Sequence, residues 1–366
     1  WHNTANMLFV DQPIGTGFSY TESNDGYAKN DNAINIDFYT FLVKFFTLHE
    51  SYSTLDSTTG IRTTRPVMFT GESHAGHYIP NMISHILEKN NEKNNKLIID
   101  VKAAALGNPW IDPATQYDAS EFAHGMGLIS KGQMYNLKEM HKRCQTLLKS
   151  GRLSQKLCFE LLDVIIDSTA APGGGRLLMY DARKFSHHSQ SFPPGHEAVE
   201  RYLSRSDVKG ALHVQDFKNN FLECTDPPYN ALAHQDGLSA VPSLIKVLDA
   251  GIRVLVYSGQ YDLICNHVSS ENVLNDMAWK GQAGFQTANS GVWIIDNAPA
   301  GYIREFQNLQ SLLCLNSGHM FPMDQPKAAL DMFTKWINNK PFSVGTTKLM
   351  SSDKVPDENC HTSHRR

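Results

Sequence analysis

Residues 66–76 read PVMFTGESHAG, and this short stretch decides the fold class that the rest of the sequence must fit. Its apolar first half predicts a buried strand, and the helical pattern that follows it ends near Lys89. Ser73 lies where the strand turns into the helix, with small residues on both sides that leave room for a strained backbone. Such a turn is typical of a nucleophile elbow, in which amides at the start of the helix face developing negative charge. The alternative is a serine that only caps the helix.

A serine hydroxyl is a poor nucleophile unless a histidine accepts its proton and a carboxylate orients that histidine. The sequence supplies both groups, each in a loop directly after a predicted strand. The strand at 252–257 is followed by SGQYD, which ends at Asp262, and the strand at 312–315 is followed by NSGH, which ends at His319. With sixteen histidines in the chain, any one of them is a weak signal. The position of His319 after a strand and a glycine, beyond a suitable aspartate, favours a triad of Ser73, Asp262 and His319.

The surrounding elements predict an α/β fold, with a mostly parallel central sheet flanked by helices and a helical cap inserted into it. The predicted strands are 6–10, 66–70, 97–106, 252–257, 291–295 and 312–315, and the predicted helices include 31–49 and 327–338. A helical pattern with little strand signal covers 115–164 and is followed by the flexible loop PGGG at 172–175. We therefore expect the first part of the core at 1–114, the cap at 115–200, the second part of the core at 201–345 and a polar tail at 346–366.

Composition excludes several classes of partner. Hydrophobic residues make up 41% of the chain and its formal net charge is −4, so there is no electrostatic reason to expect nucleic acid or an anionic membrane as a partner. No apolar run is long enough to predict a membrane span. The six cysteines contain no CxxC pair, and the pair His74 and His77 has no third ligand at a recognisable spacing. We expect no metal and no other cofactor, and the sequence leaves the oligomeric state open, a homodimer included.

Five segments, in order along the chain, resemble motifs of the serine carboxypeptidases, which are α/β-hydrolases. They are WHNTANMLFVDQPIGTGFSY at 1–20, GESHAGHYIP at 71–80, GNPWIDP at 107–113, SGQYD at 258–262 and GHMFPMDQP at 318–326. The resemblance implies an enzyme that binds the C-termini of peptides and proteins and hydrolyses the last peptide bond. The reaction would pass through an acyl-enzyme on Ser73 and would need no cofactor.

The same resemblance implies roles for side chains around the triad. Glu72 matches a glutamate that binds the terminal carboxylate of the substrate, which two acidic groups can do only by sharing a proton, so activity at acidic pH is expected. A glutamate that interacts with the helix N-terminus is the alternative. His74, Cys265 and Met320 match positions that line the substrate pockets, although Cys265 and Met320 are equally suited to filling a core.

Two further expectations come from the resemblance. Cys144 and Cys158 match a disulfide within the cap, the alternative being two buried thiols. The resemblance also implies a location in the endomembrane system, either vacuolar, lysosomal or secreted.

The chain departs from the family pattern in two places. His74 stands where the family has tyrosine, which makes the adjoining pocket more polar. Its backbone amide, one of the two oxyanion donors that the resemblance implies, does not depend on the side chain. The family segment N-G-G-P-G-C-S-S, expected upstream of Trp1, would add a second oxyanion amide, a strand between 6–10 and 66–70, and the cysteine that pairs with the position of Cys224. We therefore expect this chain to be an N-terminally incomplete part of an active enzyme.

Three other functions fit parts of the pattern. A serine-carboxypeptidase-like acyltransferase would use the same triad to move an acyl group to an alcohol or amine instead of water. A non-catalytic relative would follow from the absence of the glycine-rich loop. A lipase or esterase fits less well, because Glu72 beside the nucleophile suits a substrate that ends in a carboxylate.

Overall fold

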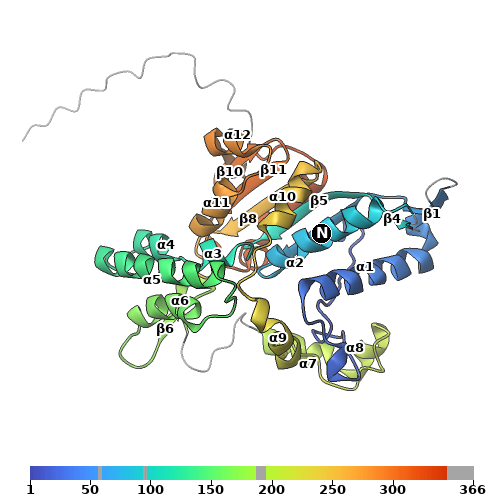
Figure 1. Cartoon of the computed structure of the whole chain (residues 1–366), viewed down its shortest axis with the longest axis horizontal. Coiled ribbons are helices and arrows are strands. Elements are labelled where there is room, and N and C mark those ends of the chain that lie inside the picture. The colour runs from blue at the N-terminus through green and yellow to red at the C-terminus, as the bar shows by residue number, and fades with distance from the viewer. Residues whose placement is uncertain (57–59, 94, 96, 187–194, 344–366) are drawn as a thin grey trace, which may run out of the picture.

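The computed structural model describes residues 1–56, 60–93, 95, 97–186 and 195–343. Its centre is a six-stranded sheet with the order β3-β5-β8-β11-β10-β9 (Figure 1). The four strands from β3 to β11 are parallel, and β10 and β9 continue the sheet in antiparallel pairing. The strand bounds are β3 (Val67–Glu72), β5 (Val101–Gly107), β8 (Arg253–Gly259), β9 (Ser290–Ile295), β10 (Ala298–Phe306) and β11 (Leu309–Cys314). The predicted mostly parallel α/β sheet is confirmed.

Helices cover both faces of this sheet, and alternate side chains of the central strands point to opposite faces. On one face, Leu106 and Val256 pack in a cluster with α1 (Asp31–Leu48), α2 (Ala75–Asn90) and α10 (Val241–Asp249). On the other face, Ala105 and Leu255 pack with α14 (Pro326–Ile337). Burial on both faces explains why these strands read as continuous apolar runs, and the predicted helices 31–49 and 327–338 correspond to α1 and α14.

A separate helical layer follows β5 and has a hydrophobic core of its own. It consists of α3 (Pro113–Gln116), α4 (Ser120–Gly125), α5 (Lys131–Lys149) and α6 (Lys156–Ser168), and Figure 1 places it beside one end of the sheet. A disulfide between Cys144 and Cys158 joins α5 to α6, as expected. The layer ends in a hairpin of β6 (Arg176–Leu178) and β7 (Asp181–Ser186), which the helical pattern did not predict.

The remaining described elements are short. They are β1 (Ser53–Asp56), β2 (Gly60–Thr63), β4 (Leu97–Ile98), α7 (His196–Leu203), α8 (Ser206–Ala211), α9 (Asp226–Leu232), α11 (His267–Asp276), α12 (Gln282–Thr287), α13 (Phe321–Asp324) and three single 3₁₀ turns. The predicted strand 97–106 is in fact two strands, β4 and β5, which belong to different sheets. The predicted tail 346–366 lies outside the described residues.

The prediction of a strand at 6–10 is wrong. This segment forms no strand, and its side chains are not buried: Phe9 is 85% exposed and Leu8 45%. An apolar run becomes a strand only where a neighbour supplies hydrogen-bond partners for its backbone. In the described part of the chain β3 is the first strand of the sheet, and nothing pairs with its outer edge.

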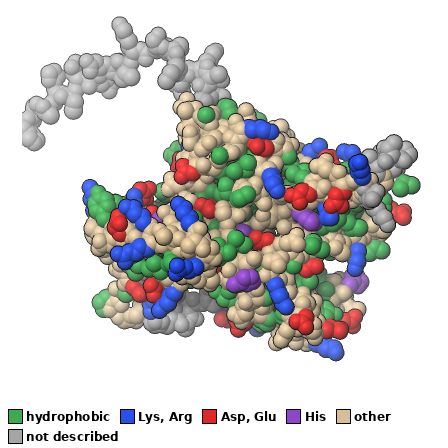
Figure 2. Space-filling view, viewed as in Figure 1, with side chains coloured by type: hydrophobic (Ala, Val, Ile, Leu, Met, Phe, Trp, Pro, Cys, Tyr) green, Lys and Arg blue, Asp and Glu red, His purple; other side chains and the backbone are tan. Residues whose placement is uncertain are grey.

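Two further features are the distribution of surface charge and the character of the helices. Basic and acidic side chains alternate over the face seen in Figure 2, without a large area of one sign. Within the described ranges, no helix combines the length and the apolar character that a membrane crossing requires.

Candidate active site

Ser73 lies at the sharp turn between β3 and α2 and has a positive φ of 60°, which is rare for a residue with a side chain. Backbone hydrogen bonds hold this conformation: the Ser73 amide donates to Gly107 O (2.8 Å), and its carbonyl accepts from Trp110 N (2.9 Å). The small residues are required by packing, because a Cβ on Gly71 would lie 2.5 Å from the Cβ of Ala75. The turn therefore has the strained, tightly packed geometry expected of a nucleophile elbow.

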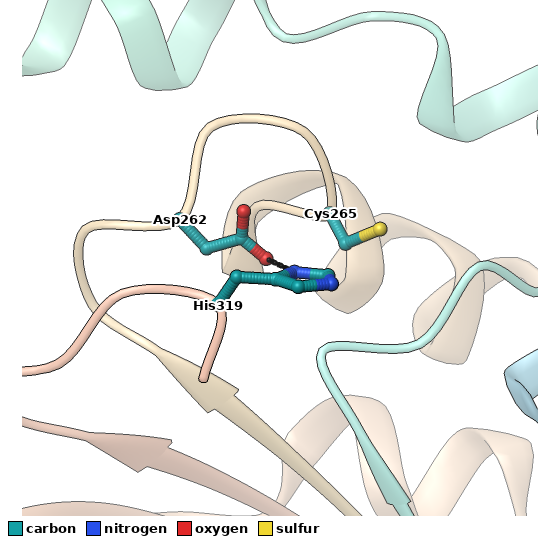
Figure 3. Close-up of side chains that lie close together, drawn as sticks. All are labelled: Asp262, Cys265 and His319. Atoms are coloured by element: carbon teal, nitrogen blue, oxygen red, sulfur yellow. Dashed lines mark hydrogen bonds and ion pairs between the residues drawn. The ribbon is translucent and has the colours of Figure 1, made fainter. Parts of the chain in front are cut away.

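Asp262 and His319 are brought together across the sheet, although they are far apart in sequence. His319 Nδ1 lies 2.7 Å from Asp262 Oδ2 (Figure 3), and the Asp262 side chain is fully buried. Asp262 follows the carboxyl end of β8 and His319 follows that of β11, and these two strands are parallel neighbours. Ser73 follows the same end of β3, so all three residues lie along one edge of the sheet, where open α/β sheets place their ligands.

Asn108 is a member of this site that the sequence did not single out. Its Nδ2 donates to Asp262 Oδ2 at 2.7 Å, and its Oδ1 accepts from the amide of Gly259 at 3.2 Å. It follows the carboxyl end of β5, the strand between β3 and β8. The signal that could have found it is this position directly after a buried parallel strand.

The hydrogen bonds fix the proton arrangement of the acid–base pair. An ionised carboxylate only accepts hydrogen bonds, so His319 Nδ1 carries the proton and Nε2 of the neutral ring is left as the base. Burial of the ring works against protonation, but the charge and hydrogen bond of Asp262, together with the charge of Glu72, outweigh it, so the pKa of His319 is raised above its usual value. The pair is thus built to hold a proton on the histidine when one is transferred to it.

Cys265 lies on the other side of the histidine ring from Asp262 (Figure 3). Ligand atoms of Asp262, Cys265 and His319 all lie within 4.8 Å of one another. Burial raises the pKa of the Cys265 thiol well above its usual value, and the nearby Ser73 hydroxyl only partly opposes this. Cys265 is therefore a protonated thiol next to Ser73, which places this sequence-predicted residue at the site. Among the described contacts, no hydrogen bond joins the Ser73 hydroxyl to His319.

Glu72, the last residue of β3, is a further ionisable group close to His319. Burial raises the pKa of Glu72 to about 7; His319 opposes the rise, and the carboxylates of Asp262 and Asp324 add to it. A carboxyl group with this pKa is protonated in weakly acidic solution and can then donate a hydrogen bond to another carboxylate.

The other residues singled out from the sequence take different positions. His74 directly precedes α2 and is an exposed residue, but desolvation by its surroundings, with His77 next, lowers the pKa of His74 to about 4. His77 Nε2 lies 2.9 Å from Asp31 Oδ2, so His77 is engaged with α1. Met320 is half-buried next to His319 in the chain, at the start of α13. Cys224 is a free, exposed thiol.

Known proteins resemble this chain over almost its whole length. The family model described as serine carboxypeptidase matches residues 1–339. The chain is 36% identical to a pheromone-processing carboxypeptidase KEX1 of Phytophthora infestans, over 96% of this chain and 60% of that protein. It is 35% identical to serine carboxypeptidase S10 family member 2 of Dictyostelium discoideum, over 97% of this chain and 64% of that protein. The chain thus spans less than two thirds of the length of these two relatives.

A solved structure shares the fold. The prohormone-processing carboxypeptidase KEX1ΔP of Saccharomyces cerevisiae superposes with a TM-score of 0.77 at 26% sequence identity. The match covers 90% of this chain and 73% of that one.

Proposed function

This chain belongs to the serine carboxypeptidase family, and from that premise we propose that it removes the C-terminal residue of peptides and proteins by hydrolysis. In this proposal Ser73 is the nucleophile, His319 the general base and Asp262 the group that orients the histidine. The observation that carries the proposal is the buried hydrogen bond of 2.7 Å between His319 Nδ1 and Asp262 Oδ2, beside a serine held at a positive φ.

The proposed reaction has two steps. In the first, His319 Nε2 accepts the proton of the Ser73 hydroxyl while Oγ attacks the last peptide carbonyl, and the C–N bond breaks as the histidine returns the proton to the departing amine. The products are a free amino acid and an ester on Ser73. In the second step His319 removes a proton from water, which attacks the ester carbonyl. The ester C–O bond breaks as the histidine returns that proton to Ser73 Oγ, and the shortened peptide leaves with a new carboxylate. Among the hydrogen bonds of the described residues, none joins the Ser73 hydroxyl to His319, so we propose that this contact forms when substrate binds.

Electrostatic stabilisation of the oxyanion is assigned to the start of α2. The amide of His74 follows Ser73 directly, and the positive end of a sixteen-residue helix lies behind it. Most of the side chains that line the pocket beside His74 are polar, among them Tyr78 and Asp236. We therefore do not expect a purely apolar preference for the substrate side chain that would occupy this pocket.

Glu72 supplies the part of the proposal that concerns substrate choice and pH. A protonated Glu72 can donate a hydrogen bond to the terminal carboxylate of the substrate, whereas an ionised Glu72 would repel it. Because the pKa of Glu72 is raised to about 7, binding is expected to be strong at acidic pH and to weaken as the pH rises through 7. The disulfide between Cys144 and Cys158 supports the companion proposal that the protein works in an oxidising compartment such as the secretory pathway.

The test is the release of free amino acids from N-blocked dipeptides between pH 4 and pH 8, by the protein expressed from its complete gene. The proposal predicts release that falls as the pH rises through 7, where Glu72 ionises, and falls again in more acidic solution, where His319 becomes protonated. Release is expected to be abolished in Ser73→Ala. If no amino acid is released but the acyl group of an ester substrate is transferred to an added alcohol or amine, the enzyme is an acyltransferase. If a folded protein does neither, the chain is a non-catalytic member of the family.

A further inference from the structure

The β6–β7 hairpin contacts both loops that carry the acid–base pair. The carbonyl of Met179 accepts hydrogen bonds from the amides of Leu263 (3.0 Å) and Ile264 (3.1 Å), just beyond Asp262. The carbonyl of Tyr180 accepts one from the amide of His319 itself, at 2.7 Å. One short segment of the hairpin therefore joins the loop of the carboxylate to the loop of the histidine.

Arg183, on β7, adds a set of side-chain contacts to this junction. Its Nε and Nη2 bind the two oxygens of the Asp181 carboxylate at 2.9 Å each, and its Nη1 donates to the carbonyl of Asn316 at 2.8 Å. Its Nη2 also lies 3.2 Å from Asp324 Oδ2, and that same oxygen accepts from the amide of Gly318 at 2.8 Å. The guanidinium thus holds the segment 316–318 at both ends, directly at Asn316 and through Asp324 at Gly318.

The segment that Arg183 holds cannot shift without moving His319, which follows it directly. Asn316 has a positive φ of 57°, a conformation that needs support from its surroundings. A Cβ on Gly318 would lie 2.4 Å from the carbonyl oxygen of Tyr180, so the loop and the hairpin are in close backbone contact. Asp181 is 1% exposed, and its buried charge is balanced by Arg183 and by Lys184, whose Nζ lies 3.0 Å away.

We propose that Arg183 is a positioning residue that sets the place of His319 relative to Asp262. It acts through the backbone of 316–318 and touches none of the three triad residues in its side-chain hydrogen bonds. The predicted effect on the reaction rate rests on the proposed function, whereas the predicted effect on the position of His319 does not. The guanidinium donates to four oxygens on three residues, Asp181, Asn316 and Asp324, which the single ammonium of a lysine cannot reproduce.

The experiment compares Arg183→Gln and Arg183→Lys with Arg176→Gln, a matched control on β6. Arg176 also forms an ion pair within the cap, with Asp167. It is exposed, and this described side-chain contact does not involve the loop that carries His319. In protein with isotope-labelled histidine, the Nδ1 proton of His319 gives a nuclear magnetic resonance signal that requires no activity. We expect this signal to shift or exchange faster in Arg183→Gln, to be partly restored in Arg183→Lys and to be unchanged in Arg176→Gln.

Kinetics provide the second readout. A misplaced base should lower kcat by about 10- to 100-fold in Arg183→Gln while KM changes little, because the substrate contacts are untouched. If the wild-type protein cleaves no peptide, the proposed function fails while the resonance still tests the positioning role. If Arg183→Gln does not fold, Asp324→Asn weakens the link from Arg183 to Gly318, together with the ion pair of Asp324 with Lys184, and must show the same changes in the His319 signal and in kcat more weakly. A His319 signal and a kcat that remain as in wild type, in whichever of these variants fold, would overturn the proposal.

Discussion

Asn108 and His319 bind the same oxygen of Asp262, each at 2.7 Å, so the carboxylate is held by two groups that follow different strands, β5 and β11. Asn108 in turn has a positive φ of 40° and accepts a hydrogen bond from Gly259, which ties β5 to the end of β8. The orientation of the acid therefore depends on a residue outside the expected triad.

The first prediction concerns this residue. Asn108→Gly removes both side-chain hydrogen bonds without adding backbone strain, because glycine tolerates a positive φ. It leaves a buried carboxylate with one partner fewer, so we expect the free energy of unfolding to fall by about 1–3 kcal/mol and kcat to fall by about 10-fold. Denaturant unfolding and dipeptide kinetics measure the two effects.

Its control is Asn297→Gly, at an exposed turn residue that also has a positive φ. The free energy of unfolding of that variant should lie within about 0.5 kcal/mol of wild type, since glycine adopts the same backbone conformation. Equal effects of the two substitutions would show that the Asn108 side chain contributes nothing to the site.

The second prediction concerns the pH dependence that Glu72 produces. Its pKa is raised from 4.5 in the unfolded chain to about 7 in the folded protein. The group is neutral in both states below pH 4.5, and it disfavours the folded state increasingly as the pH rises from 4.5 through 7. Glu72→Gln should therefore equal wild type in stability at pH 4 and exceed it by about 2 kcal/mol at pH 8, after allowance for partial exposure. Denaturant unfolding at the two pH values checks this.

The same substitution separates binding from chemistry. In wild type, KM for a dipeptide should rise as the pH passes 7, because an ionised Glu72 repels the substrate carboxylate. In Glu72→Gln that rise should be absent, since the amide keeps its donor at every pH. A KM that rises equally in both proteins would remove Glu72 from the substrate site.

The third prediction concerns the contact between α1 and α2, the helix that begins at the nucleophile turn. Asp31→Ala removes the partner of His77, which is buried and bonded at 2.9 Å. We expect a loss of about 1–3 kcal/mol in the free energy of unfolding, because a buried polar ring is left without its acceptor. Lys29→Ala, which removes an exposed ion pair with Asp25, should cost less than about 0.5 kcal/mol. A similar small effect of both substitutions would contradict the structural role of the buried pair.

The local sequence pattern singled out three residues that the structure brings to one edge of the sheet. Ser73, Asp262 and His319 each follow an apolar run at a small or glycine-containing turn, and a parallel sheet gathers such positions at one edge. Asn108 could not be found in this way, because its role exists only once β5 lies between β3 and β8.

Other errors have equally local causes. β10 was missed because it contains Pro299 and Gly301, which interrupt the strand pattern and lie at a register shift. The β6–β7 hairpin was missed inside a region dominated by helical periodicity, and with it the contacts of Arg183. The apolar run at 6–10 was assigned to a strand by its composition alone, and composition does not supply a pairing partner.

The central claim is that Ser73, His319 and Asp262 act together to release the last residue of a peptide. The most direct measurement is the rate of free amino acid release from an N-blocked dipeptide, at the pH where wild type releases it fastest, for wild type, Ser73→Ala and His319→Ala. The account predicts release by wild type, and a loss of several orders of magnitude in both variants while their folding remains intact. Release that continues at the wild-type rate in either folded variant would contradict it.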